Sequence, residues 1–189
     1  MKKISISNFV TLDGFFAGPH GELDWFKVIA SDPEYDKYTH TQSKSGGTLL
    51  FGHTTYEMMK SYWPTPEAEK GDPKMAKVMN NSRKVVVSKT LKTADEGPIW
   101  KNIQILHELD PREIVGLKER EDLVILGSGS IVQQLANLGL IDEFQVLVVP
   151  VVLGAGKPLF RDVGKLELEL VESRAFKNGI LSLRYQPKK

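Results

Sequence analysis

The spacing of hydrophobic and polar residues changes along the chain, and each spacing predicts a type of secondary structure. Alternating apolar and polar side chains in ISISNFV (residues 4–10) are typical of a half-buried strand. Short apolar or β-branched runs predict buried strands at 46–52, 83–89 and 122–126, and a shorter strand at 103–106.

Helical patterns separate these strands. The predicted helices cover residues 33–43, 54–63, 110–120 and 130–139. The first helix opens with a Ser-Asp-Pro start signal, and the second is stopped by Pro64 and Pro66. We expect residues 64–82 to be polar and irregular, with one short helix around 72–80.

The last third of the chain is rich in β-forming residues. A long run over 142–154 is interrupted by Pro150, which we expect at a sheet edge or a bulge. Asn-Gly at 178–179 lies between two β-patterned segments, 165–176 and 180–186, and predicts a hairpin. The order of elements predicts a single α/β domain over residues 1–189, with a mixed sheet of about eight strands and a terminal hairpin.

Composition narrows the possible functions. A hydrophobic content of 41% and a charged content of 26% are ordinary for a globular protein. The net charge of +1, without a basic stripe, gives little support to nucleic-acid or membrane-surface partners. We read no signal peptide and no membrane span, and we therefore expect a cytoplasmic protein. The lack of cysteine excludes thiol catalysis and, with four scattered histidines, predicts no metal site.

Two strand-to-helix junctions carry residues suited to an anion. Gly52 ends a strand, and Thr54 or Thr55 can cap a helix whose N-terminus attracts negative charge. Taken alone, this junction is better explained as an ordinary N-cap. Ser88 and Lys89 follow the carboxyl end of another strand, where open α/β sheets bind ligands, although a solvated turn lysine is the simpler explanation.

A third junction lies in LGSGSIV. Gly127 and Gly129 permit positive φ angles and a close approach of the backbone to a ligand. The dinucleotide fingerprint G-x-G-x-x-G is incomplete because Val132 stands at its last position, so a tight turn explains the segment equally well. Three such junctions on successive parallel strands together favour one phosphate-binding site.

Candidates for acid–base chemistry are few. Asp13 lies in a Gly-rich loop, where it can stabilise a turn or face a ligand. Asp36 lies in the first predicted helix, and it is a buried ligand-binding carboxylate or a solvated charge, depending on which way it points. Trp25, Phe26 and Trp63 can wall an aromatic pocket or belong to the core.

These segments, in this order, resemble the dihydrofolate reductase superfamily, and most closely the stand-alone version of its RibD C-terminal domain type. The resemblance is carried by TLDGFFAG, LLFGHTTYE, RKVVVSKT, LVILGSGSIVQQL and PVVLGAGKPLF. It implies a three-layer α/β fold with a mixed, mostly parallel eight-stranded sheet flanked by helices. It also implies an NADPH cofactor and a homodimer, without the zinc deaminase domain of the bifunctional riboflavin enzyme.

The resemblance also implies residue roles. The implied cofactor-binding residues are Gly52, His53, Thr54 and Thr55 at the phosphates, Ser88 and Lys89 at the adenosine 2′-phosphate, and Gly127, Ser128, Gly129, Ser130 and Ile131 at the pyrophosphate. The loop 11–18 would border the nicotinamide. This chain has His53 where the family often has Arg, and Ser128 where it usually has a second glycine. Asp36 falls about where dihydrofolate reductases hold their pterin-binding carboxylate.

We therefore expect an NADPH-dependent reductase of a small nitrogen heterocycle of pyrimidine or pterin type, as in riboflavin or folate metabolism. Trp25 and Asp36 would bind the substrate, and Asp13 or Asp36, or a water held by one of them, would supply the proton. One alternative is a weak dihydrofolate reductase. The other is an NADP(H)-binding module without catalysis.

Overall fold

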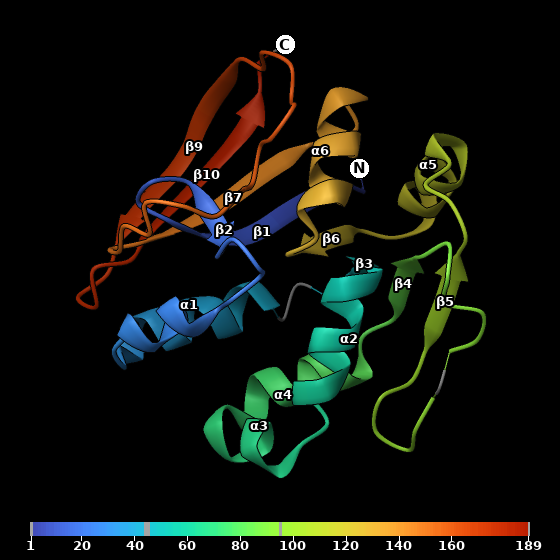
Figure 1. Ribbon diagram of the computed structural model, residues 1–189, viewed down its shortest axis with the longest axis horizontal. Helices are drawn as coiled ribbons and strands as arrows, with labels where there is room; N and C mark the ends of the chain where they lie inside the picture. Colours follow the sequence, from blue (N-terminus) through green and yellow to red (C-terminus); the bar gives the residue numbers. More distant parts are fainter. Residues whose placement is uncertain (1, 44–45, 95, 189) are drawn as a thin grey trace.

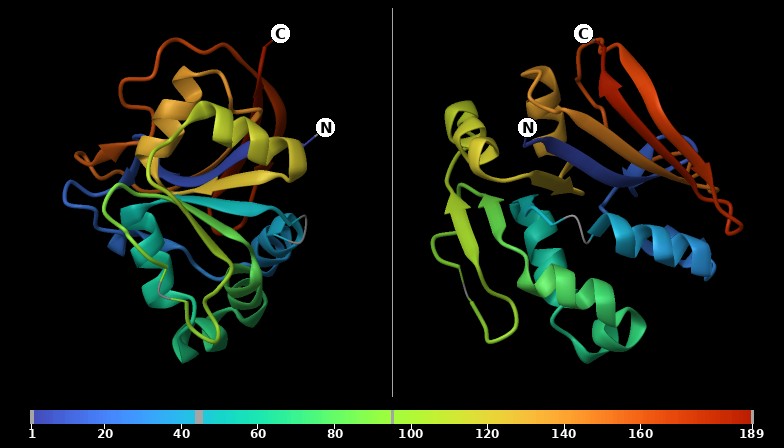
Figure 2. Two further views of the ribbon diagram at one scale, coloured as in Figure 1. Left: turned by 90° about the vertical axis from the view of Figure 1, so that its right-hand side faces the viewer. Right: turned by 180° about the vertical axis from the view of Figure 1, so that it is seen from behind.

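The computed structural model describes residues 2–43, 46–94 and 96–188. One eight-stranded sheet crosses the molecule and separates two layers of helices (Figures 1 and 2). In Figure 1, α5 and α6 lie above the sheet, while α1 to α4 lie below it. The three-layer arrangement agrees with the fold class expected from the sequence.

The sheet is mostly parallel. Its strands, in spatial order, are β5 (Ile103–Leu106), β4 (Lys84–Val87), β3 (Thr48–Gly52), β6 (Leu123–Leu126), β1 (Ile4–Thr11), β7 (Glu143–Val149), β10 (Leu181–Pro187) and β9 (Leu168–Ala175). The neighbours from β5 to β7 pair in parallel, whereas β10 is antiparallel to both β7 and β9. This order confirms the predicted mixed sheet and the C-terminal hairpin.

Each helix predicted from the sequence is present, and one further helix is found. The α-helices are α1 (Pro33–Ser43), α2 (His53–Tyr62), α3 (Pro66–Gly71), α4 (Pro73–Asn81), α5 (Pro111–Arg120) and α6 (Gly129–Asn137), with a 3₁₀ turn η1 at Asp24–Val28. The expectation of an irregular segment before α4 is wrong, because α3 occupies it. The Thr65 hydroxyl accepts the Ala68 N–H, and Pro66 follows as a helix-starting residue.

The expectation for Pro150 is also wrong. Strand β7 ends at Val149, and it lies between β1 and β10 rather than at a sheet edge. Proline, which has no N–H to donate, thus ends an inner strand instead of marking an edge or a bulge. A small second sheet, in which β2 (Phe15–Ala17) pairs with β8 (Lys157–Pro158), was not predicted, because both strands are too short to show a period.

Alternation along β1 divides the molecule into two sides. Ile4, Ile6 and Val10 join the core that also holds α5 and α6. Ser5, Ser7 and Phe9 point to the opposite side, over which α1 lies. The apolar side of the sheet therefore packs into the core with α5 and α6. The other side presents polar side chains toward α1 (Figure 1).

Lys84 is a fully buried cation in this fold. Its Nζ donates to the carbonyl oxygens of Asn80 (3.0 Å), Ser82 (2.8 Å) and Lys101 (3.2 Å), and it lies 4.2 Å from the centre of the Trp100 ring. Burial lowers the pKa of Lys84 to about 8, although the nearby Glu96 charge acts in the opposite direction. The folded state therefore releases this proton more easily than the unfolded chain does.

Substitution of Lys84 by Met should reveal this burial as a pH-dependent difference in stability. Below about pH 8 the lysine is charged in both states, and the cost of burying the charge is complete. As the pH rises toward the unfolded pKa of about 10.4, only the folded state has lost the proton, so the wild type gains stability relative to Lys84→Met. Urea unfolding at about pH 7.5 and about pH 10 should show a relative gain of roughly 2 kcal/mol.

The exposed lysine Lys92 gives the matched control. Lys92→Met should differ from the wild type by the same amount at both pH values. A difference between wild type and Lys84→Met that stays constant with pH would show that the buried amine does not titrate in this range.

Candidate functional site: a cleft at the strand ends

A cleft of about 1420 Å³ follows the carboxyl ends of β3, β4 and β6 and continues beneath β1 and β7 toward α1. Every residue that the sequence assigns to the cofactor borders it, namely Gly52, His53, Thr54, Thr55, Ser88, Lys89, Gly127, Ser128, Gly129, Ser130 and Ile131. The three junctions thus border a single cleft, as expected for the ends of neighbouring parallel strands.

Ser128 joins two of these junctions. Its Oγ accepts the backbone N–H of Gly52 (2.8 Å), and its own N–H donates to the Oγ1 of Thr55 (3.0 Å). The Ser128 side chain is therefore directed at the β3–α2 turn rather than only at the cleft. Its φ of 50° and ψ of 58° lie in the left-handed region, which a residue with a side chain can occupy.

Gly127 makes this contact between the turns possible. Its φ is +61°, and a Cβ at this position would come within 3.0 Å of the Thr55 Cγ2. The Asn8 Nδ2 donates to the Gly127 carbonyl oxygen (3.1 Å), which also ties the turn to β1. A larger residue would push the β6–α6 turn away from Thr55.

Two helices begin at the cleft. Gly52 is the N-cap of α2, and Ser128 is the N-cap of α6. Within the described residues, neither N-cap makes a side-chain capping bond, and neither first turn contains an acidic residue. The first N–H groups of both helices and the positive ends of their dipoles are thus suited to bind an anion.

The junction after β4 carries an exposed basic group. Lys89 is exposed and has no acidic partner within 4.0 Å among the described residues. The Ser88 hydroxyl is buried and accepts the N–H of Leu91 (3.0 Å) and Thr90 (3.3 Å), so it stabilises its own turn. His53 reaches the same turn through a contact of 3.0 Å between its Nδ1 and the Thr90 hydroxyl.

Sequence reasoning did not single out His107, which also borders the cleft. Its Nδ1 donates to the Ser88 carbonyl oxygen at 3.3 Å. His107 follows β5, the strand next to β4, so its place after a carboxyl strand end was a usable signal.

Asp13 and Trp25 do not border the cleft. The Asp13 carboxylate accepts the Thr11 hydroxyl (2.6 Å) and the N–H groups of Gly154 (2.8 Å) and Leu153 (3.2 Å). The Thr11 bond, followed by these backbone bonds, lowers the pKa of Asp13, so it stays ionised and ties two loops together. Trp25 is buried in the core, although Phe26, which stacks on it at 4.2 Å, does reach the cleft.

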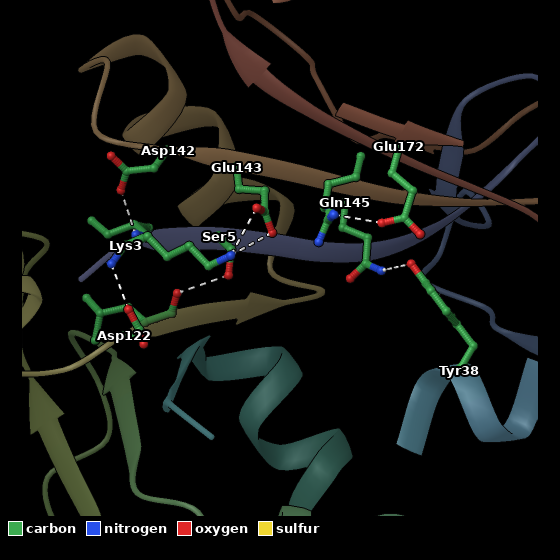
Figure 3. A network of polar contacts seen from close by, with 11 residues as sticks. Lys3, Ser5, Tyr38, Asp122, Asp142, Glu143, Gln145 and Glu172 are labelled. Atoms are coloured by element: carbon green, nitrogen blue, oxygen red, sulfur yellow. Dashed lines mark hydrogen bonds and ion pairs between the residues drawn. The ribbon is translucent and has the colours of Figure 1, made fainter. Parts of the chain in front are cut away.

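The other half of the cleft lies between α1 and the sheet. Asp36, Tyr35 and Tyr38 border it from the helix. The Asp36 side chain is exposed at the rim of the cleft. Burial raises the pKa of Tyr35, so its hydroxyl stays protonated. Figure 3 shows polar side chains of β1 and β7 along the facing side of the sheet.

Among residues 2–43, 46–94 and 96–188, no helix is long and apolar enough to cross a membrane. The same part of the chain contains no group of three or more histidine, aspartate or glutamate residues placed to hold a metal ion.

The sequence matches a protein family described as the RibD C-terminal domain over residues 2–182. A curated relative is the uncharacterized protein YyaP of Bacillus subtilis. It is 33% identical over 187 residues, which are 97% of this chain and 94% of the relative.

Solved structures share the fold at low sequence identity. A protein of Shewanella sp. PV-4, named as a candidate riboflavin biosynthesis protein, has a TM-score of 0.79 at 20% identity and covers 99% of both chains. The Thermotoga maritima deaminase/5-amino-6-(5-phosphoribosylamino)uracil reductase has a TM-score of 0.66 at 15% sequence identity. The match covers 99% of this chain and 57% of the Thermotoga maritima chain. Dihydrofolate reductase of Enterococcus faecalis, solved with NADP(H), has a TM-score of 0.63 at 15% sequence identity. The match covers 99% of this chain and 97% of the reductase. The fold is therefore that of dihydrofolate reductase.

Ser128→Ala should weaken the link between the two junctions. The Gly52 N–H loses its acceptor, and we expect a loss of unfolding free energy of about 1–2 kcal/mol in chemical denaturation. Ser130, exposed in the first turn of α6, provides the control, because Ser130→Ala should change stability by less than about 0.5 kcal/mol. Equal effects of the two substitutions would contradict the bridging role of Ser128.

Proposed function

The chain belongs to the RibD C-terminal domain family, and we propose that it is an NADPH-dependent reductase of a small nitrogen heterocycle of pyrimidine or pterin type. The observation that carries this proposal is the single cleft bordered by all three junctions. Two helix N-termini without acidic first turns meet there beside an exposed lysine, which suits a ligand with several phosphate groups.

The residues present fit a phosphorylated dinucleotide. The backbone around Gly127 and Gly129 would approach the pyrophosphate, together with the first turn of α2. Lys89 would supply positive charge for the 2′-phosphate. NADP(H) binding by the Enterococcus faecalis dihydrofolate reductase, which has this fold, supports the same assignment.

When bound, the reduced nicotinamide supplies a hydride, and the chain orients the acceptor and delivers the proton. Of the two candidate carboxylates, only Asp36 borders the cleft, so we assign proton delivery to Asp36, directly or through a water. The bonds that keep Asp13 ionised make it a poor proton source. Tyr35, protonated and next to Asp36, can donate a hydrogen bond to the acceptor.

Two other functions use the same cleft. A weak dihydrofolate reductase would oxidise NADPH with dihydrofolate and be blocked by an antifolate. A binding module would hold NADPH tightly but oxidise it with no pterin, pyrimidine or carbonyl compound. The expected homodimer and cytoplasmic location stay predictions.

Lys89→Glu tests cofactor choice. It places a negative charge beside the proposed 2′-phosphate, so NADPH affinity should fall by at least about tenfold more than NADH affinity in a fluorescence titration. Lys92, an exposed lysine outside the cleft, is the matched control, and Lys92→Glu should leave the ratio unchanged. An equal loss of both cofactors in Lys89→Glu would remove Lys89 from this role.

Asp36→Asn and Asp13→Asn should separate proton delivery from structural support. With a substrate found by screening, Asp36→Asn should lower kcat by about 10²-fold and leave the melting temperature close to that of the wild type. Asp13→Asn should lower the melting temperature by a few degrees, because its carboxylate joins two loops. Unchanged turnover in Asp36→Asn would place the proton donor elsewhere.

A further inference from the structure

The floor of the α1 half of the cleft consists of three rows of paired residues. Strands β1 and β7 align Ser5 with Glu143, Ser7 with Gln145, and Phe9 with Leu147. All six side chains border the cleft, as expected for alternate positions of neighbouring parallel strands. Toward the carboxyl ends the floor therefore changes from charged, through neutral polar, to apolar.

The Gln145 amide in the middle row is anchored by a hydrogen bond to Tyr38. Its Nε2 donates to the Tyr38 hydroxyl oxygen (2.9 Å), which is 2.8 Å from the Ser182 Oγ. Tyr38 is only 6% exposed, so this anchor is fixed by packing. Figure 3 shows the amide with its nitrogen toward Tyr38 and its oxygen turned away from it.

With its Nε2 engaged by Tyr38, Gln145 keeps its Oε1 as an acceptor. No donor among the described residues bonds to it, and the Ser7 hydroxyl lies in the same row without a partner in that part of the chain. A ligand that lies over this row would find an acceptor at Gln145, and a group that donates or accepts at Ser7. Such a pair suits the N–H edge of a heterocycle.

The charges along the floor do not suit a phosphate. Lys3 donates to both carboxylate oxygens of Glu143, at 3.0 and 2.9 Å, so its charge is already compensated. Arg184 lies on β10 next to Gln145, in the middle row, and it is paired with Glu172 at 2.7 Å. Asp122, at the edge of this half of the cleft, is likewise paired with Lys2 at 4.0 Å, so none of these ion pairs offers a free cation.

Lys157 is the other lysine that borders the cleft outside the dinucleotide end, among the described residues. It belongs to β8, on the rim near Gly21, and its side chain is exposed. A phosphate bound there would lie outside the rows of the floor.

The geometry points to an uncharged heterocycle with an N–H edge and no phosphate group as the substrate class, read by Gln145 and Ser7. This inference rests on the proposed reductase function and specifies its substrate. It differs from the chemistry named for the Thermotoga maritima enzyme, whose reductase substrate carries a phosphoribosyl group.

Two probes that differ only in the phosphate test the charge argument. They are 5-amino-6-(ribosylamino)uracil and its 5′-phosphate, titrated calorimetrically into the full chain with and without NADPH. The unphosphorylated probe should bind at least about tenfold more tightly. Tighter binding of the 5′-phosphate probe, with this preference lost in Lys157→Gln, would overturn the proposal. Failure of both probes to bind would also overturn it.

Substitutions at Gln145 test the acceptor. Gln145→Leu should weaken the unphosphorylated probe about tenfold, whereas Gln145→Glu should retain it within about threefold, because a carboxylate oxygen accepts the same N–H. Gln186→Leu, on β10 outside the cleft, is the control and should have no effect. Equal affinity in the wild type and Gln145→Leu, with unchanged thermal unfolding, would overturn the role of Gln145.

NADPH affinity, measured in the same samples, separates the two proposals. If the probe binds in a way that depends on Gln145 but NADPH does not bind, the proposed reductase function is wrong. The proposed recognition of the heterocycle by Gln145 would still hold. NADPH oxidation with a substrate that is insensitive to Gln145→Leu would keep the reductase and reject the substrate class.

Discussion

The pair of hydrogen bonds at Ser128 is the constraint on which the cleft depends. One residue accepts from Gly52 and donates to Thr55, and so it sets the distance between the starts of α2 and α6. Gly127 allows this approach, because any side chain there would meet Thr55. Two helix N-termini that are weak anion sites singly are thereby held at one opening, where their N–H groups can face the same anion.

The sequence predicted the sheet, most helices and the residues around the cleft, because these depend on spacing and on where strands end. It could not predict the direction of individual side chains. The Ser128 and Ser88 hydroxyls look like ligand contacts in the sequence, but both accept backbone N–H groups of the protein. The sequence left Asp13 either to stabilise a turn or to face a ligand, and its carboxylate accepts N–H groups of the loop at 153–154, which is distant in sequence. Helix α3 was missed because its polar composition has no apolar period, although its Thr-Pro start was visible.

The two halves of the cleft follow different physical rules. At the strand ends, backbone N–H groups and helix dipoles come from the fold itself. Beneath β1 and β7 the surface is made of side chains, and its chemistry depends on single residues such as Gln145. The proposed dinucleotide site therefore depends on the backbone, whereas the proposed substrate class depends on individual side chains.

We propose that three separate turns form one dinucleotide site. The most direct measurement is a titration of ¹⁵N-labelled protein with NADPH, followed by the backbone amide signals. We expect the amide signals of 52–55, 88–89 and 127–131 to shift together with a single dissociation constant, and the amide signal of Asp13 to shift little. Shifts confined to one of these turns, or different dissociation constants for different turns, would contradict it.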